Sequence, residues 1–390
     1  MKTKKKYLKL PSSYRYKGSL MVSIYRDQKG VALIATIAVV AILCVLALEA
    51  GRLAKQAASG TITENDMFAA REMAMSGIHL AMMMLAVDAA DNEIDTIQET
   101  WADPEQIALA VAAMGLNPAD LSLKISDEMG KLQLNALLKQ FPGNESNDAQ
   151  MAVLERFLTL AAPEDKPEDA GSAVEIVNAL KDWLDSRDDD AITGLTGAET
   201  NYYESLDMPY ICANGPLRHI SELFLVKGVV DSILSPSYIS QGIDESTQVD
   251  AKDMFTVYGL LEDQDSEENR LSFSGKVNIN TAPVAVLAAL LPEGRDVNAQ
   301  DLADYRLEKA NLGQAYTHTL ESGWFEDVIA LSDDEKKAFK KVITYSSNVF
   351  TADCAAQHNG AQVILHAVIK REKQDLTGKW FCRILQMERG

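Results

Sequence analysis

The chain has 390 residues, of which 47% are hydrophobic and 24% charged, so it can bury a sizeable core and we expect two or three domains. This composition excludes a disordered tail. The formal net charge of −20 argues against a general affinity for nucleic acid or anionic lipid, because both are polyanions. Divalent cations are more natural ligands for such a surface.

An apolar run from Val31 to Leu48 follows a basic N-terminal arm. Residues 1–30 hold nine Lys/Arg against one acid, whereas the rest of the chain holds 28 against 56. As a helix the run would be about 27 Å long, close to a hydrocarbon core of about 30 Å. The positive-inside rule then predicts that the arm stays in the cytoplasm and that the acidic body is exported.

The residues alone leave alternatives for this run. A secretory signal peptide cleaved near Ala47–Gly51 is disfavoured, because its apolar region would be only about 7–15 residues long. A plain signal anchor and a leader cut after Gly30, which would make Val31 the new N-terminus, both stay open.

A second helical pattern continues the first. From Arg52 to Leu85 apolar residues recur at helical spacing, which predicts one long helix that lies half in lipid and is amphipathic beyond it. Gly51 and Gly60 are possible flex points. Leu121–Ile125 alternates as a strand does, and a second short strand is expected just before Asn135.

The middle of the chain is mostly helical and its end is strand-like. We expect helices at residues 149–160, 173–184, 220–226, 284–291, 299–309, 324–330 and 334–341. We expect strands at residues 342–350, 361–370 and 379–387, the last two joined by a hairpin at 374–378. The predicted fold class is therefore α+β: a long N-terminal helix packed on a small antiparallel sheet, with a large helical domain inserted into that sheet.

No catalytic pattern is found in the sequence. The five histidines fit no paired metal-ligand spacing, and no Gly-x-Ser-x-Gly motif or phosphate loop is present. They are His79, His219, His318, His358 and His366. The chain is not expected to be an enzyme.

An acidic segment from Leu180 to Tyr203 is the main candidate for a binding site. Asp182 and Asp185 share one face at a helix end, and the loop beyond them adds further carboxylates. Such crowding is unfavourable unless a cation offsets it, and hard oxygen ligands favour Ca²⁺. We expect the ligands to be Asp185, Asp188, Asp190 and Glu199.

The match of this segment to an EF-hand is poor. Counting from Asp188, positions 3 and 12 are Asp190 and Glu199, but position 6 is Thr193, where that loop needs Gly. The alternative is a solvated acidic loop without a metal.

Three cysteines lie beyond the apolar run, which itself contains Cys44. They can form at most one internal bridge, and Cys354 with Cys382 is the more plausible pair because both flank the C-terminal strands. Free buried cysteines are the alternative.

The stretch Val277–Pro283 with the helices after it resembles helix-hairpin-helix DNA-binding repeats. The corresponding turn, Leu291–Asn298, has one glycine and two acids, and it sits in a strongly acidic body. We therefore expect a structural use of that small helical fold, with nucleic-acid binding as the alternative.

Several motifs resemble one protein family. A basic leader, Lys29-Gly30 and an apolar helix are similar to type IV prepilins and pseudopilins, and Ala35 stands where most of these have Glu. Asp-Trp-x-Asp at 182–185, Gly-Ala-Glu-x-x-Tyr-Tyr at 197–203 and Asn-Gly-Pro-Leu at 214–217 resemble the minor pseudopilins called general secretion pathway protein K. Arg187 departs from the pattern, since an Asp is usual there.

This resemblance implies a division of the chain and a role. Residues 1–30 would be a removed leader, 31–50 the membrane part of the helix, 51–135 the first part of a pilin-like domain, 136–340 an inserted helical domain with a calcium loop, and 341–390 the closing strands. Cleavage after Gly30 and methylation of Val31 are implied.

The implied protein is a minor pseudopilin of type II secretion in the inner membrane, with its body in the periplasm. It would cap the pseudopilus and help to export folded proteins. Its partners would be other pseudopilins, the prepilin peptidase, the inner-membrane platform and the bilayer through residues 31–48, and it would bind no nucleic acid. The alternative is a membrane-anchored helix-hairpin-helix protein of the DNA-uptake type.

Overall fold

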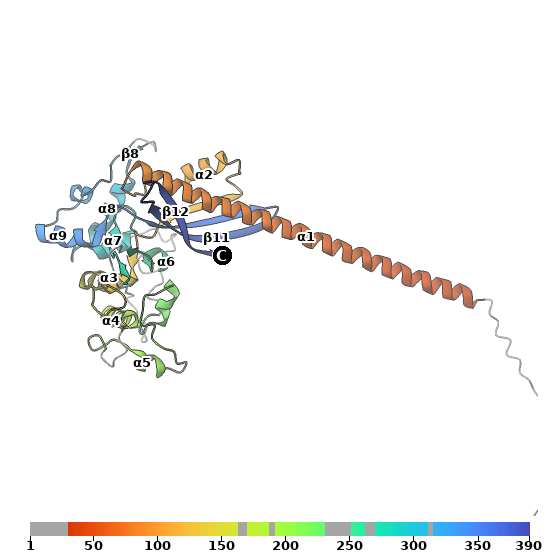
Figure 1. The fold of residues 1–390 in the computed structure, drawn as a ribbon, viewed down its shortest axis with the longest axis horizontal. Helices are drawn as coiled ribbons and strands as arrows, with labels where there is room; N and C mark the ends of the chain where they lie inside the picture. Colours follow the sequence, from red (N-terminus) through yellow and green to blue (C-terminus); the bar gives the residue numbers. More distant parts are fainter. Residues whose placement is uncertain (1–29, 163–169, 187–191, 231–250, 262–269, 311–314) are drawn as a thin grey trace, which may run out of the picture. The chain divides into compact units, whose positions relative to one another are not determined.

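A computed structural model describes residues 30–162, 170–186, 192–230, 251–261, 270–310 and 315–390. The chain divides into two compact units, Met1–Glu64 and Asn65–Gly390. Helix α1 (Val31–Asp91) contributes to both and is continuous through Gly51 and Gly60. Its residues 31–48, in the first unit, are exposed and almost all apolar, whereas buried residues of its second-unit part pack on a sheet (Figure 1).

The packed half of α1 uses small side chains at helical spacing. Ala70, Ala74, Ala81 and Leu85 are buried. At Gly77 a Cβ atom would lie only 2.3 Å from the Sγ atom of Cys354, so glycine is needed for the helix to approach the sheet this closely.

The sheet has four antiparallel strands in the order β1-β10-β11-β12. These are β1 (Leu121–Asp127), β10 (Val349–His358), β11 (Ala361–Lys373) and β12 (Trp380–Arg389). Alternate residues of β1, β10 and β11 point into the core shared with α1, as the period of two in a strand requires. Helix α2 (Pro104–Ala113), capped by Asp103, packs at the β1 edge and was not expected.

The α+β class and the long N-terminal helix are confirmed. The expected strand at 342–350 is correct only in part: helix α9 runs to Val342, residues 343–344 form a two-residue strand outside this sheet, and the long strand begins at Val349. Its core-facing residues Ala352, Cys354 and Ala356 are small because α1 lies on them, and such residues carry little strand signal. The expected strand before Asn135 is only two residues long and lies outside this sheet.

A bridge between Cys354 and Cys382 is also wrong, since both are free thiols. Cys354 pairs with Leu365 of β11, and Cys382 pairs with Arg371 on the other side of the same strand. Because β11 lies between them, their Cα atoms are at least two strand spacings of about 4.8 Å apart. This separation exceeds the limit of about 7 Å between Cα atoms that a disulfide can span.

The chain between β1 and β10 is mostly helical. Its α-helices are α3 (Asp148–Ala161), α4 (Ala173–Leu184), α5 (Thr200–Glu204), α6 (Ala251–Met254), α7 (Val284–Leu290), α8 (Ala299–Leu307) and α9 (Asp333–Val342). Its 3-10 helices are η1 (Leu134–Leu137), η2 (Ile220–Leu225), η5 (Asp296–Asn298) and η6 (Trp324–Asp327). Short strands are β2 (Leu132–Gln133), β3 (Phe255–Thr256), β4 (Leu260–Leu261), β5 (Ser272–Phe273), β6 (Val277–Asn278), β7 (Lys309–Ala310), β8 (Ala315–Tyr316) and β9 (Ile343–Thr344).

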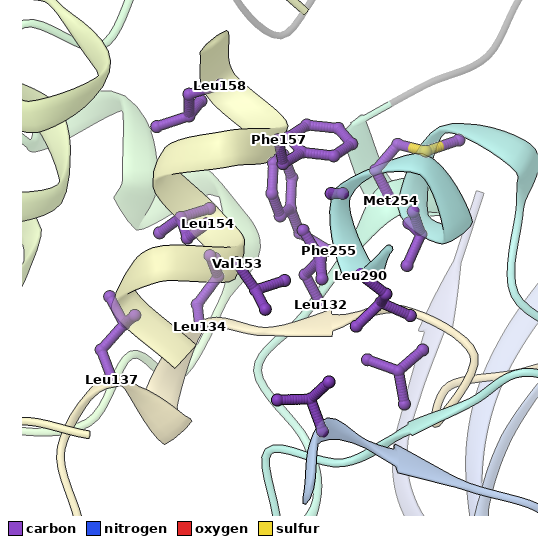
Figure 2. Close-up of a cluster of buried hydrophobic side chains, with 14 of the residues drawn as sticks. Leu132, Leu134, Leu137, Val153, Leu154, Phe157, Leu158, Met254, Phe255 and Leu290 are labelled. Carbon is purple, nitrogen blue, oxygen red and sulfur yellow. The ribbon is translucent and has the colours of Figure 1, made fainter. Parts of the chain in front are cut away.

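These helices enclose a hydrophobic core separate from the one beneath α1. Figure 2 shows its centre, where side chains of α3 meet those of β2, η1, β3 and α7. Phe157 and Phe255 pack edge to face there, with ring centroids 5.1 Å apart. This core anchors α3, against which α4 packs.

The Val277–Pro283 stretch joins the helical part to the sheet part. The buried side-chain amide of Asn278 donates to the backbone oxygen of Asp95, to Asp127 Oδ2 at the end of β1, and to Ser347 Oγ. Arg306 of α8 is buried and donates to the carbonyl oxygens of Ile279 and Ala282. The buried hydrogen bonds of Asn278 and Arg306 therefore have a structural role.

Candidate functional site

Three buried carboxylates gather at the C-terminal end of α4. One oxygen each of Asp182, Asp185 and Glu199 lie within 4.8 Å of one another. The three residues are at most 4% exposed. We call this group the α4 cluster.

Helix α4 places two of them. It begins with a capping box in which Ser172 and Glu175 bond each other's backbone N–H groups. Its apolar face, which includes Leu180 and Trp183, is fully in the core. Asp182 therefore lies in the last turn and Asp185 at the C-cap, one turn apart on the same side.

The loop after α4 folds back onto Asp182. The backbone N–H of Thr193 donates to both oxygens of that carboxylate, at 3.1 and 3.0 Å. At Gly197 a Cβ atom would lie 1.9 Å from Asp182 Oδ2, so only glycine lets the loop pass there. Glu199, two residues on, is then the N-cap residue of α5.

Burial is the largest influence on the Asp182 carboxyl of the α4 cluster. Burial raises the pKa of Asp182, and the hydrogen bonds from Thr193 oppose that rise. Lys181 approaches from the side of α4, with its Nζ atom 3.1 Å from Asp185 Oδ2 and 2.9 Å from Thr193 Oγ1. Among the described residues, Lys181 thus brings an ammonium group to one of the three carboxylates, Asp185.

The structure brings together some of the expected ligands. Asp185 and Glu199 are within reach of one cation, whereas Asp188 and Asp190 lie outside the described residues. Asp182 is the third member of the cluster among the described residues. The sequence carried a signal for it, since Asp182 and Asp185 are three residues apart on a helix, but it was not among the expected ligands.

A second carboxylate group was missed. Asp88 near the end of α1, with Asp95 and Glu99 in the following loop, also has oxygens within 4.8 Å of one another. We call it the α1 cluster. Arg371 of β11 already fills it, with Nη2 at 2.6 and 2.7 Å from the two oxygens of Asp95 and Nη1 at 3.1 Å from Asp88 Oδ2.

The expected processing residues lie at the start of α1. Val31 is the first helical residue, and the N–H of Ile34 donates to the carbonyl oxygen of Gly30 at 3.1 Å. Both Gly30 and Val31 are exposed. Among the described residues, α1 is the one helix with an 18-residue window apolar enough to cross a membrane, and none of that window is buried.

Comparisons with known proteins converge on one family. A family model described as "Type II secretion system (T2SS), protein K" matches residues 130–235, which include the α4 cluster. The chain is 27% identical over 230 residues to a type II secretion system protein K of Klebsiella pneumoniae, and 28% identical over 210 residues to one of Aeromonas hydrophila. These alignments span 57% and 52% of this chain, and 65% and 60% of those proteins, less than two thirds of either.

A solved structure shares the fold. It comes from the GspK-GspI-GspJ complex of the enterotoxigenic Escherichia coli type 2 secretion system and matches with a TM-score of 0.53 at 18% identity. The match covers 85% of this chain and 99% of that one.

Proposed function

Since this chain belongs to the type II secretion system protein K family, we propose that it is a minor pseudopilin that caps the tip of a periplasmic pseudopilus. There it helps to start fibre assembly for the export of folded proteins across the outer membrane. The observation that carries the proposal is the match of residues 130–235 to the protein K model. The role is mechanical, with no catalytic step of its own.

The anchor and its direction follow from charge. The apolar start of α1 spans the inner membrane, the basic arm stays in the cytoplasm and the acidic body lies in the periplasm. Prepilin peptidase cuts after Gly30, and Val31 becomes a methylated N-terminus. Gly30 is exposed and no described atom lies within 4 Å of a Cβ atom placed there, which supports this because a cleavage junction must admit the peptidase to the backbone.

The position at the tip follows from Ala35 and from the helical part. A Glu at the fifth mature residue would pair with the terminal ammonium of the next subunit, and an unpaired charge in lipid is costly. A chain with Ala35 offers no such partner and needs no neighbour above it. The helices between β1 and β10 would obstruct stacking within a shaft but are free at an end.

The proposed role also specifies the type of each domain and the partner subunits. The sheet with the packed half of α1 is a pilin-like domain, and α7 and α8 are a helix-hairpin-helix element used structurally. The similar chain of known structure comes from a complex with GspI and GspJ, which supports other minor pseudopilins as partners here. The major pseudopilin and the inner-membrane platform complete the set.

Calcium is the cation that suits the α4 cluster. Its donor set is three buried carboxylates, the hard oxygen ligands that Ca²⁺ prefers, and Gly197 lets the loop pass close to one of them, Asp182. Asp182, Asp185 and Glu199 would hold the ion, and the expected ligands Asp188 and Asp190 belong to the loop between them. When bound, Ca²⁺ supplies positive charge that offsets the carboxylates and fastens the loop to α4.

Immunogold labelling of purified pseudopili tests the tip position. An epitope in the periplasmic body should place gold at one end of each fibre, and mass spectrometry of the same protein should find a methylated Val31. Gold along the whole fibre would contradict the proposal. Nothing in the comparisons supports the DNA-uptake alternative, which salt-dependent DNA binding by the purified protein would revive.

A further inference from the structure

The α4 cluster contains its own positive charge. Lys181 belongs to α4, and only 14% of its side chain is exposed. Its ammonium group bonds Asp185 Oδ2, four residues on, and Thr193 Oγ1 across the loop. Lys227, a second lysine near this loop, instead donates to the carbonyl oxygens of Thr196 and Gly197.

Thr193 makes the lysine part of the site. Its hydroxyl accepts from Lys181, while its backbone N–H donates to Asp182. The lysine, the loop and two of the three carboxylates therefore form one connected network. A charge at the Lys181 position acts on the carboxylates at contact distance, where screening by salt is weakest.

We propose that Lys181 is an internal counter-ion that holds the loop on α4 when the cation is absent and competes with the cation for Asp185. This inference rests on the proposed cation site and concerns how tightly that site binds. A lysine suits the role because its ammonium is a compact charge on a flexible stem. It bonds Asp185 in the cation-free state and repels a divalent ion in the bound state.

The two effects act in opposite directions on binding and stability. A +2 and a +1 charge about 6 Å apart in a water-like dielectric repel enough to weaken binding by about tenfold. Removal of the lysine charge should therefore tighten Ca²⁺ binding. The same change should destabilise the cation-free protein, because buried Asp185 loses its bond to the ammonium group.

Calorimetric titration of the full chain in detergent with CaCl₂ tests this. Lys181→Gln keeps a donor toward Thr193 and should bind Ca²⁺ about tenfold more tightly than wild type, while its melting temperature in chelator falls. The matched control is Lys336→Gln on α9, which also removes a lysine paired with a carboxylate, Glu326, and should change neither quantity. Lys181→Arg keeps the charge and should bind within about twofold of wild type.

The outcomes separate the two proposals. Wild type that binds Ca²⁺ while Lys181→Gln binds equally or more weakly would overturn the counter-ion role alone. No binding by wild type or by any variant would overturn the cation site and this inference with it. If Lys181→Gln does not fold, Lys181→Arg tests the role instead. A Ca²⁺ affinity of Lys181→Arg that differs from wild type by more than about twofold would contradict a role set by charge.

Discussion

The α1 cluster and the α4 cluster each bring one oxygen of three carboxylates within 4.8 Å of one another, but the described cations that bond them differ. In the α1 cluster the guanidinium of Arg371 bonds two carboxylates at once and also donates to the carbonyl oxygen of Ser347. In the α4 cluster the ammonium of Lys181 bonds one carboxylate, Asp185. Three carboxylates within reach of one another therefore do not by themselves indicate a metal site.

The difference follows from the two cations. A guanidinium has five donors in a fixed plane and can bond several oxygens at once. The carboxylates of the α1 cluster that Arg371 bonds therefore already have a fixed partner within the fold. An ammonium is a single mobile charge. We therefore expect the α1 cluster to contribute to stability, and it is the α4 cluster for which we propose an exchangeable cation.

The largest expected effect comes from opening the α1 cluster. Arg371→Met removes the partner of buried Asp88 and Asp95, and loss of one partner of a buried pair costs about 3–5 kcal/mol. Urea unfolding of the protein should show this loss of unfolding free energy. Arg383→Met, which removes an exposed arginine paired with Glu372, should cost at most about 1 kcal/mol. Equal losses of unfolding free energy in the two variants would contradict a special contribution of Arg371 to stability.

The next effect is stabilisation by calcium through the α4 cluster alone. At about 100 times its dissociation constant a bound ion adds about 2.7 kcal/mol, so the melting temperature should rise by several degrees over that in chelator. Asp182→Asn should erase this rise. Asp95→Asn, the matched change in the α1 cluster, should lower both melting temperatures and keep the difference between them. A calcium effect that survives Asp182→Asn would break the assignment.

The smallest expected effect is a pH dependence of the α1 cluster. Burial raises the pKa of Glu99 to about 7, above the value of about 4.3 for an unfolded chain. Such a group binds more protons when folded, so its stabilisation is complete below about pH 4 and is lost as the pH rises through about 7. Burial also raises the pKa of Asp95 and of Asp127 to about 6, and they act in the same direction.

Glu99→Gln isolates that contribution. The amide keeps an acceptor for the Trp101 indole N–H and the Thr96 backbone N–H but cannot ionise. The fall in unfolding free energy between pH 5 and 8 should shrink by on the order of 1–2 kcal/mol relative to wild type. A fall of unchanged size would mean that Glu99 is already ionised throughout that range.

Local patterns made much of this structure predictable. Helix α4 was expected at its observed limits because its apolar residues repeat at helical spacing, and the structure adds Ser172 as its cap. Asp185 and Glu199 could be found because they belong to one acidic segment. The α1 cluster could not, since Arg371 joins Asp95 from 276 residues away and no local pattern records such a contact.

Strand β10 was hidden for a related reason. Its core-facing residues are small because α1 packs on them, and small residues have low strand propensity. The reason for them is therefore visible only when the helix and the sheet are seen packed together. The same is true of Gly197. Glycine is required at this position because Asp182 lies against it in space, and not because of the residues next to it in the sequence.

The pairing of β1 with β10 also sets an order of events during synthesis. A ribosome releases α1 and β1 early, yet the partner of Leu121 is Ala356, so the apolar side of α1 has no sheet to cover it until nearly all of the chain has emerged. Closing so long a loop is slow compared with forming the helices between its ends. The nascent protein must therefore fold its interior helices first and keep its N-terminal portion from aggregating in the meantime, and a chain that stops before β10 would never bury that side of the helix.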